Sequence, residues 1–174
     1  QGIPINKDFE YEGGFFNLLN PYALITGVTV LALFMMHGAT YLIMKTENRL
    51  HTKLRVLAKN TSRFFVISYV TLTMATLIYL PQTADKFRQH PFLFIVPVLT
   101  ILTIINTRRL LEKGVYFKAF LSSALTSALL LITVTINLFP NIVISTINPA
   151  FNITVYNGAS SQKSLGIMLT IAAI

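Results

Sequence analysis

The feature that most constrains this chain is a series of long apolar segments that carry no charged residue near their centres. A helix rises about 1.5 Å per residue, so about 20 apolar residues cross the roughly 30 Å hydrocarbon core of a bilayer. In lipid the backbone must satisfy its own hydrogen bonds, and continuous apolar runs favour helices over the alternating strands of a barrel. The complete segments are Pro21–Met44, Phe64–Leu80, Pro91–Asn106 and Val115–Phe139, and a further one opens near Ser164. The sequence therefore predicts an all-α integral membrane protein, an up-and-down bundle of four complete transmembrane helices plus a truncated fifth.

Composition agrees with a membrane location and excludes several kinds of site. Hydrophobic residues make up 53% of the 174 and charged residues only 11%, whereas soluble domains carry about 25% charged residues. The absence of cysteine excludes disulfides, thiolate metal sites and cysteine nucleophiles. The net charge of +8 could suggest nucleic acid, but the basic residues lie between apolar runs, as in membrane proteins, so no nucleic-acid partner is expected.

Local signals refine the boundaries. Asn20 can cap a helix in which Pro21 takes the first position, and Pro97 should kink the third segment or lie in its first turns. We expect one transmembrane domain over 1–174, with an outer or interfacial lead-in at 1–20 and an outer loop at 140–163. In that loop Phe151–Tyr156 alternates like a short strand. Asn152–Thr154 matches a glycosylation acceptor, and chance explains this match best if the source is bacterial.

Loop charge predicts the orientation. The stretches 45–63 and 108–118 hold six and four basic residues, and the opposite side holds four in all. The positive-inside rule therefore places the 45–63 and 108–118 loops of this multi-pass membrane protein in the cytoplasm, with the N-terminal end and the 140–163 loop outside. Basic residues in the first of these loops are expected to bind anionic lipid head groups: Arg49, Lys53, Arg55 and Lys59. The short outer group Asp85, Lys86, Arg88 and His90 is interpreted as a solvated turn with local ion pairs.

His37 is the ionisable residue inside a predicted span, and it shares a helix face with Thr40 and Tyr41. Thr26 and Thr29 fall on roughly the same side. Such residues usually face protein or a water-filled cavity, so two functional roles of His37 are considered, a proton path and a heme ligand. The alternative that we favour is a buried polar contact, in which a neutral His37 is hydrogen-bonded to a neighbouring helix.

The fourth span carries small residues at helical spacing. Ala119, Ser123 and Ser127 lie on one line, and Ala124 and Ala128 lie on an adjacent one. Small residues let membrane helices approach closely, so we predict a helix-packing face, with a quinone or lipid groove as the alternative. His37, His51 and His90 are too scattered to define a site, and no phosphate loop, metal cluster or nucleophile–base pair is present. No catalytic, cofactor-binding or metal-binding residue is therefore assigned.

The first span carries a more specific pattern. The segments Gly14–Leu24 (GFFNLLNPYAL) and His37–Glu47 (HGATYLIMKTE), with Gly27 between them, resemble the middle of subunit II of cytochrome bd-type quinol oxidases. Asn48 departs from the family, in which glycine is common at that position. Ala159–Leu165 (ASSQKSL) before an apolar run is similar to the approach to the last helix of that family.

This resemblance implies the second four-helix half of a longer subunit, cut at both ends. It implies a non-heme accessory subunit of a terminal oxidase that oxidises quinol and reduces oxygen to water in the respiratory chain. Hemes b and d are then expected in the partner, subunit I, and none is bound by this chain alone. A structural quinone is possible, membrane lipids are partners, and quinol is reached through the complex. Part of a secondary transporter and a structural membrane scaffold are the alternatives.

Overall fold

The chain folds as an all-α membrane helix bundle with two very short strands, so the predicted fold class is confirmed. This computed structural model describes residues 2–80, 87–88 and 90–173. Four helices in it are long and apolar enough to cross a membrane. The chain divides into two compact units, one made of Phe15–Asn137 and the other of Gln1–Gly14 together with Leu138–Ile174. The expectation of a single transmembrane domain over 1–174 stays a prediction.

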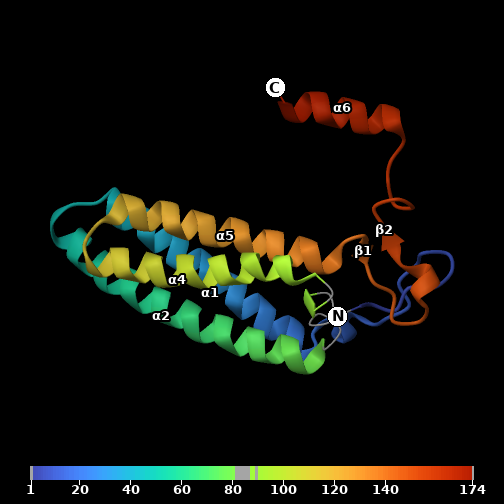
Figure 1. Cartoon of the computed structure of the whole chain (residues 1–174), viewed down its shortest axis with the longest axis horizontal. Coiled ribbons are helices and arrows are strands. Elements are labelled where there is room, and N and C mark those ends of the chain that lie inside the picture. The colour runs from blue at the N-terminus through green and yellow to red at the C-terminus, as the bar shows by residue number, and fades with distance from the viewer. Residues whose placement is uncertain (1, 81–86, 89, 174) are drawn as a thin grey trace. The chain divides into compact units, whose positions relative to one another are not determined.

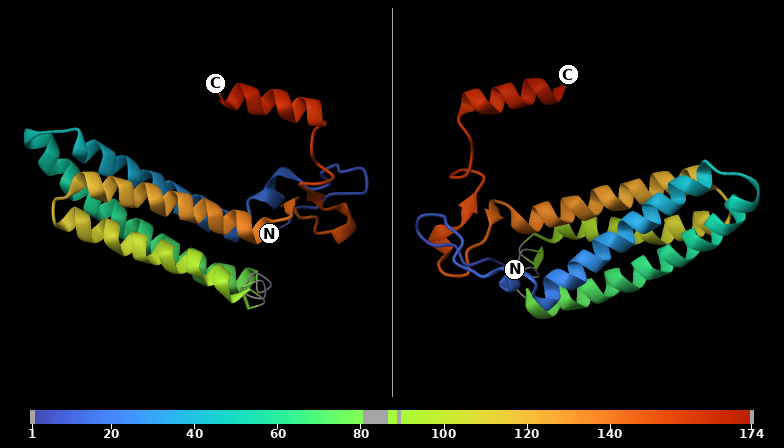
Figure 2. Two further views of the ribbon diagram at one scale, coloured as in Figure 1. Left: turned by 45° about the horizontal axis from the view of Figure 1, so that its top comes forward. Right: turned by 180° about the vertical axis from the view of Figure 1, so that it is seen from behind.

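The first unit is the helical bundle. Its long helices run side by side and alternate in direction along the chain, as Figures 1 and 2 show. The elements are η1 (Phe15–Leu18), α1 (Pro21–Met44), α2 (Asn48–Tyr79), η2 (Pro91–Phe94), α4 (Ile95–Glu112) and α5 (Tyr116–Leu138).

The limits of α1 agree with the prediction because its start is fixed by local chemistry. The Asn20 side chain accepts a hydrogen bond from the Ala23 amide at 2.8 Å, and Pro21 takes the first helical position. A three-residue connection leads to α2, where Asn48 has a φ of 58°. Asparagine tolerates this left-handed conformation better than most residues, which explains how it replaces the glycine common in the resembling family.

The prediction for α2 was wrong at its start, which is Asn48 instead of Phe64. The stretch predicted as a basic loop is mostly helical, and Arg49, Lys53 and Arg55 are exposed on it. Leu54 and Ala58 are buried on the opposite face of these turns, and this packing stabilises helix well before the apolar run begins. At 32 residues the helix is about 48 Å long, longer than a hydrocarbon core.

The third span also differs from the prediction at its end. A short η2 precedes α4, which continues to Glu112 instead of stopping at Asn106. Pro97 lies in the first turn of α4, where a missing N–H breaks no helical hydrogen bond.

The helix then stops at Gly114, whose φ of 74° allows the Gly114 amide to bond the Leu111 carbonyl (3.3 Å) and the Val115 amide to bond the Leu110 carbonyl (3.0 Å). This pair of bonds is a Schellman motif, which ends α4 and starts α5 after a short turn.

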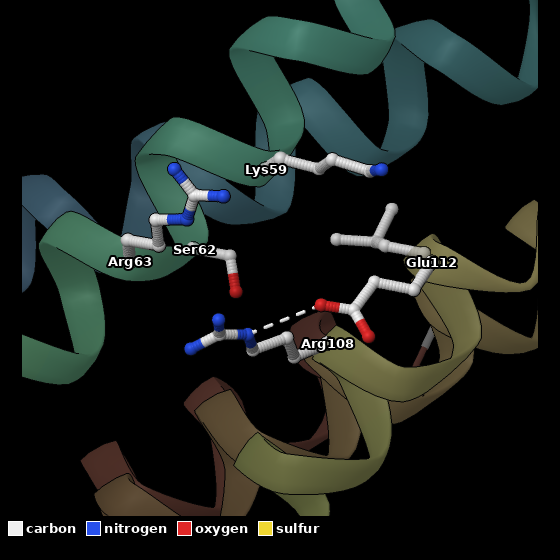
Figure 3. A pocket seen from close by; sticks show the side chains of 6 residues that line it. Lys59, Ser62, Arg63, Arg108 and Glu112 are labelled. Atoms are coloured by element: carbon white, nitrogen blue, oxygen red, sulfur yellow. Dashed lines mark hydrogen bonds and ion pairs between the residues drawn. The ribbon is translucent and has the colours of Figure 1, made fainter.

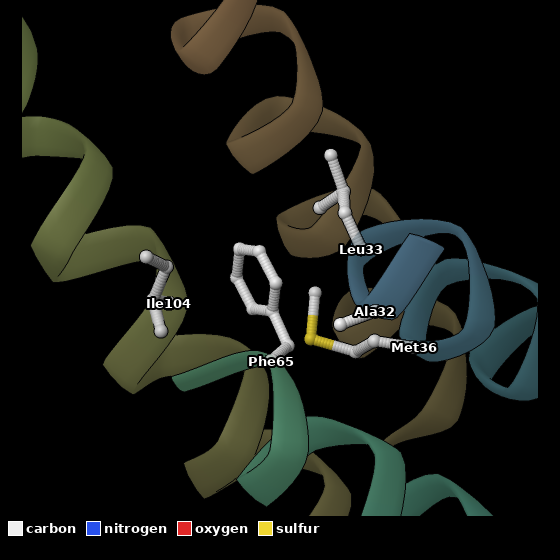
Figure 4. Close-up of a cluster of buried hydrophobic side chains, with 5 residues drawn as sticks. All are labelled: Ala32, Leu33, Met36, Phe65 and Ile104. Atoms are coloured by element: carbon white, nitrogen blue, oxygen red, sulfur yellow. The ribbon is translucent and has the colours of Figure 1, made fainter. Parts of the chain in front are cut away.

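The bundle core consists of two clusters of buried apolar residues. In the first, the Phe65 ring of α2 lies between Ile104 of α4 and Met36 of α1, and Ala32 and Leu33 complete it (Figure 4). In the second, one small or branched residue from each long helix meets the others: Ala39, Ala58, Leu111 and Ala119. Small side chains at this level let the helix backbones come close together.

The second unit joins the N-terminal segment to the chain after α5. It holds β1 (Asn141–Val143), η3 (Pro149–Phe151), β2 (Ile153–Thr154) and α6 (Gln162–Ala173), and the antiparallel β1–β2 pair includes part of the predicted strand. The Ile3 amide donates to the Ile144 carbonyl at 2.9 Å, and the Ser145 hydroxyl donates to the Ile5 carbonyl at 2.9 Å. These bonds hold the N-terminal segment and the segment after β1 together within this unit.

Candidate functional site

The two sets of residues that the sequence singled out meet between α1 and α5. His37 is partly buried on α1, and its Nδ1 lies 2.8 Å from the Ser123 hydroxyl oxygen on α5. Ser123 and Thr40 are fully buried, and their hydroxyl oxygens are 3.3 Å apart. Together His37, Thr40 and Ser123 form a small polar site between two apolar helices, named here the histidine–serine site.

Both hydroxyl groups of this site also bond backbone carbonyls of their own helices. The Thr40 hydroxyl donates to the His37 carbonyl at 2.7 Å, and the Ser123 hydroxyl donates to the Phe120 carbonyl at 2.8 Å. If both hydroxyl protons stay on these carbonyls, the bond between His37 Nδ1 and the Ser123 oxygen requires the Nδ1–H tautomer, in which the imidazole is the donor. In that tautomer the acceptor lone pair lies on Nε2.

Aromatic rings form one wall of the histidine–serine site. The Phe120 ring stacks on the His37 ring with centroids 4.9 Å apart and an interplanar angle of 26°. Tyr41 is 45% exposed, and the centroid of its ring lies 5.7 Å from that of the Phe120 ring. Tyr41 therefore lies at the rim of the site. Phe120 was missed in the sequence, although it precedes Ser123 by three residues and so shares its helix face.

The three residues of the predicted small-residue line on α5 differ in their contacts. Ala119 is fully buried among the other three long helices, and Ser123 is fully buried against α1. Ser127 is only partly buried, and its hydroxyl donates to the Ser123 carbonyl of its own helix at 3.1 Å. Ala119 and Ser123 thus contact neighbouring helices, while the Ser127 hydroxyl bonds within α5.

A second polar layer, which sequence reasoning missed, joins α4 to α5. Ser122 donates to the Thr103 carbonyl at 3.0 Å and accepts from Thr107 at 3.0 Å and from Asn106 at 3.2 Å. One turn further, the Thr126 hydroxyl donates to the Thr103 hydroxyl at 3.0 Å. The spacing of Thr100, Thr103 and Thr107 by three and four residues is the signal that could have revealed this layer.

Other predicted residues lie away from the histidine–serine site. Thr29 faces α2, where its hydroxyl lies 3.2 Å from the Ser68 carbonyl, and Thr26 bonds the Tyr22 carbonyl of its own helix. The ring nitrogens of His51 contact the Thr46 carbonyl at 3.0 Å and the Tyr116 hydroxyl at 3.3 Å.

The predicted outer group is described only in part. Asp85 and Lys86 lie outside the described residues, and Arg88 is exposed. His90, also exposed, packs its ring near Phe92. Within residues 2–80, 87–88 and 90–173, no group of three or more His, Asp or Glu side chains is arranged to hold a metal ion.

Comparison with known proteins relates the whole chain to one family. The family model described as cytochrome bd terminal oxidase subunit II matches residues 1–174. The chain is 29% identical over 209 residues to "Cytochrome bd-I ubiquinol oxidase subunit 2" of Escherichia coli (strain K12). It is 27% identical over 203 residues to "Probable cytochrome oxidase subunit 2" of Haemophilus influenzae and 25% identical over 179 residues to "Cytochrome bd ubiquinol oxidase subunit 2" of Bacillus subtilis. In each case all of this chain is covered, but only 54%, 54% and 50% of the relative, so the chain spans about half the length of these relatives.

Proposed function

Because the chain belongs to the cytochrome bd terminal oxidase subunit II family, we propose that it is part of the non-heme accessory subunit of a quinol-oxidising, oxygen-reducing enzyme. The match of the family model along residues 1–174 is the observation that carries this proposal. The names of two relatives, which call them ubiquinol oxidase subunits, support quinol as the electron donor. The subunit number in those names supports a heterodimer with a subunit I.

We further propose that subunit I holds hemes b and d and that this chain supplies no axial heme ligand. An axial bond requires a free ring nitrogen. Both nitrogens of His51 are already in polar contacts, whereas His37 is bonded to Ser123 through Nδ1 alone, so for His37 the proposal is tested by the heme spectra of a His37→Ala variant. His37 instead holds α1 and α5 together, because its bond to Ser123 and its stacking on Phe120 both join these helices.

A proton path through His37, Thr40 and Tyr41 is the second role proposed for the histidine–serine site. Among the described residues only Nδ1 of His37 has a polar partner, so Nε2 is available to exchange a proton. Substitution of His37 by Gln, which keeps a donor but does not titrate, separates this role from simple packing. Normal assembly with slowed proton uptake during oxygen reduction would support the path, and unchanged uptake would refute it.

We place the protein in the bacterial inner membrane, with the basic ends of α2 and α4 in the cytoplasm. The exposed apolar side chains along α1, α2, α4 and α5 then contact lipid or the partner subunit. The transporter alternative is not favoured, because Pro97, the only predicted break in a span, lies in the first turn of α4.

Purification of the assembled protein tests the proposal. The full reading frame, with an affinity tag, is expressed in a bacterial strain without other terminal oxidases, together with its neighbouring larger subunit gene. Capture through the tag should recover a heme-bearing partner and quinol-dependent oxygen consumption. Solvent extraction of the same preparation tests for a structural quinone. Recovery of the tagged protein without a heme-bearing partner, or full oxidase activity in its absence, would refute the accessory role.

A further inference from the structure

A small cavity lies between α2 and α4, at the end of the bundle where the basic residues gather. Its volume is about 110 Å³, whereas about 10–15 Å³ of such space is enough to hold one water molecule. Figure 3 shows the side chains around it, contributed by both helices. They are Lys59, Ser62, Arg63, Arg108, Leu111 and Glu112. The histidine–serine site shares no residue with this cavity.

Ser62 is the observation that points to a ligand. Its side chain is 1% exposed, and its hydroxyl oxygen has no hydrogen-bond partner in the described part of the chain. The neighbouring Thr61 behaves differently, because its hydroxyl donates to the Leu57 carbonyl of the preceding turn at 3.0 Å. The Ser62 hydroxyl points from α2 into the space beside Arg108 (Figure 3). Since buried polar groups are nearly always hydrogen-bonded, this hydroxyl is positioned for a partner inside the cavity.

The charges around the cavity select an anion. Three cationic side chains face one carboxylate, and that carboxylate is engaged, because Glu112 Oε1 lies 3.4 Å from Arg108 Nε. Among the described residues, Lys59 and Arg63 make no hydrogen bond or ion pair. The remaining guanidinium and ammonium donors, with the serine hydroxyl, are the groups that bind the oxygens of a phosphate.

The position of the cavity along the helices identifies the source of that phosphate. The apolar run of α2 begins at Phe64, directly after Arg63, and the charged residues of α4 begin at Arg108, directly after its apolar run. The cavity therefore lies at the level where hydrocarbon gives way to head groups. Exposed Ile67 lies four residues after Arg63, and exposed Ile105 lies three residues before Arg108, each about one turn toward the apolar core. They offer a surface for acyl chains.

We propose that this cavity binds the phosphate of an anionic phospholipid head group, with Arg63, Arg108 and Lys59 as cationic ligands and Ser62 as a buried donor. The bound lipid bridges α2 and α4 at the membrane surface. This site depends on the membrane location of the bundle and not on oxidase activity, so the two proposals fail separately.

Native mass spectrometry of the full-length protein, in the assembly with which it purifies, tests the site. The delipidated sample is titrated in detergent with phosphatidylglycerol, with phosphatidylcholine and with inorganic phosphate. We expect one phosphatidylglycerol to bind about ten-fold more tightly than phosphatidylcholine. Arg63→Gln should lower the affinity for phosphatidylglycerol about ten-fold. Ser62→Ala should weaken the binding of phosphatidylglycerol a few-fold, because the cavity loses its buried hydrogen-bond donor.

Arg49→Gln is the matched control, since it removes the same charge from an exposed position of α2 outside the cavity. Equal weakening by Arg49→Gln and Arg63→Gln would mean that only the general positive charge of this end attracts lipid, which overturns the site. Equal affinity for phosphatidylcholine would overturn the requirement for an anionic head group. Displacement of phosphatidylglycerol by inorganic phosphate at comparable affinity would assign the cavity to free phosphate and overturn the lipid source.

Discussion

Substitution of Ser123 by leucine should separate α5 from α1 and reduce assembly. Ser123 is fully buried, its oxygen lies 2.8 Å from His37 Nδ1, and the Phe120 ring stacks on that imidazole. A leucine side chain has no room there without displacing the imidazole or the helix. It also removes the hydrogen-bond partner of His37.

The expected cost follows from these two effects. Overpacking of a filled site typically costs about 1–3 kcal/mol, and a hydrogen bond between membrane helices contributes about 0.6–1.7 kcal/mol. Together they predict a loss of about 2–4 kcal/mol, which is about 30-fold to 1000-fold in an association constant. Ser123→Ala removes only the hydrogen bond, and it should cost about 1 kcal/mol.

The yield of intact complex from detergent-solubilised membranes measures the effect. Leu121→Phe is the matched control, because Leu121 lies on the same helix and is 50% exposed. The control should assemble at nearly the level of the unsubstituted protein, with Ser123→Ala slightly below it and Ser123→Leu far below. If Ser123→Leu and Leu121→Phe gave the same yield, the contact between His37 and Ser123 would not hold the helices together and the reasoning would be refuted.

Three further predictions use other parts of the chain. His37→Ala should leave the heme spectra of the assembled oxidase intact; loss of one heme band with all subunits present would show that His37 is a ligand after all. A cysteine at Thr52, which is exposed on α2, should resist an impermeant thiol reagent in intact cells and react in opened ones, whereas labelling from outside would reverse the proposed orientation. Gly114→Ala should lower the thermal stability of the complex by about 1–2 kcal/mol, because its φ of 74° is strained for alanine, and an unchanged melting temperature would argue against this turn.

Some elements of the fold could be predicted closely because short-range signals determine them. Asn20 and Pro21 define the start of α1, and α5 lies within one residue of the predicted Val115–Phe139. The start of α2 could not be predicted from short-range signals of this kind. Hydropathy predicts where the hydrocarbon core begins. A helix, however, can continue outside that core wherever one of its faces is buried against protein, and in α2 this buried face includes Leu54 and Ala58.

The candidate site shows the same division between local and non-local information. Helical periodicity could indicate that Ser123 lies on a packing face and that His37 needs a polar partner. It could not pair the two, because their contact joins residues that are 86 positions apart and depends on how α1 and α5 are rotated about their axes. The layer around Ser122 was missed for a related reason, since threonines within apolar runs resemble isolated helix residues until the neighbouring helix is known.

Ser122 and Ser123 show how one helix can serve two neighbours. They are adjacent in sequence and therefore differ by about 100° around α5, so Ser122 reaches α4 while Ser123 reaches α1. In lipid there is little hydrophobic drive for helices to associate, so close packing and hydrogen bonds must supply the attraction. Serine provides both, because its small side chain permits close approach and its hydroxyl bonds across the gap. The two serines thus orient α5 about its axis relative to both partners, which a purely apolar helix of the same length would leave poorly determined.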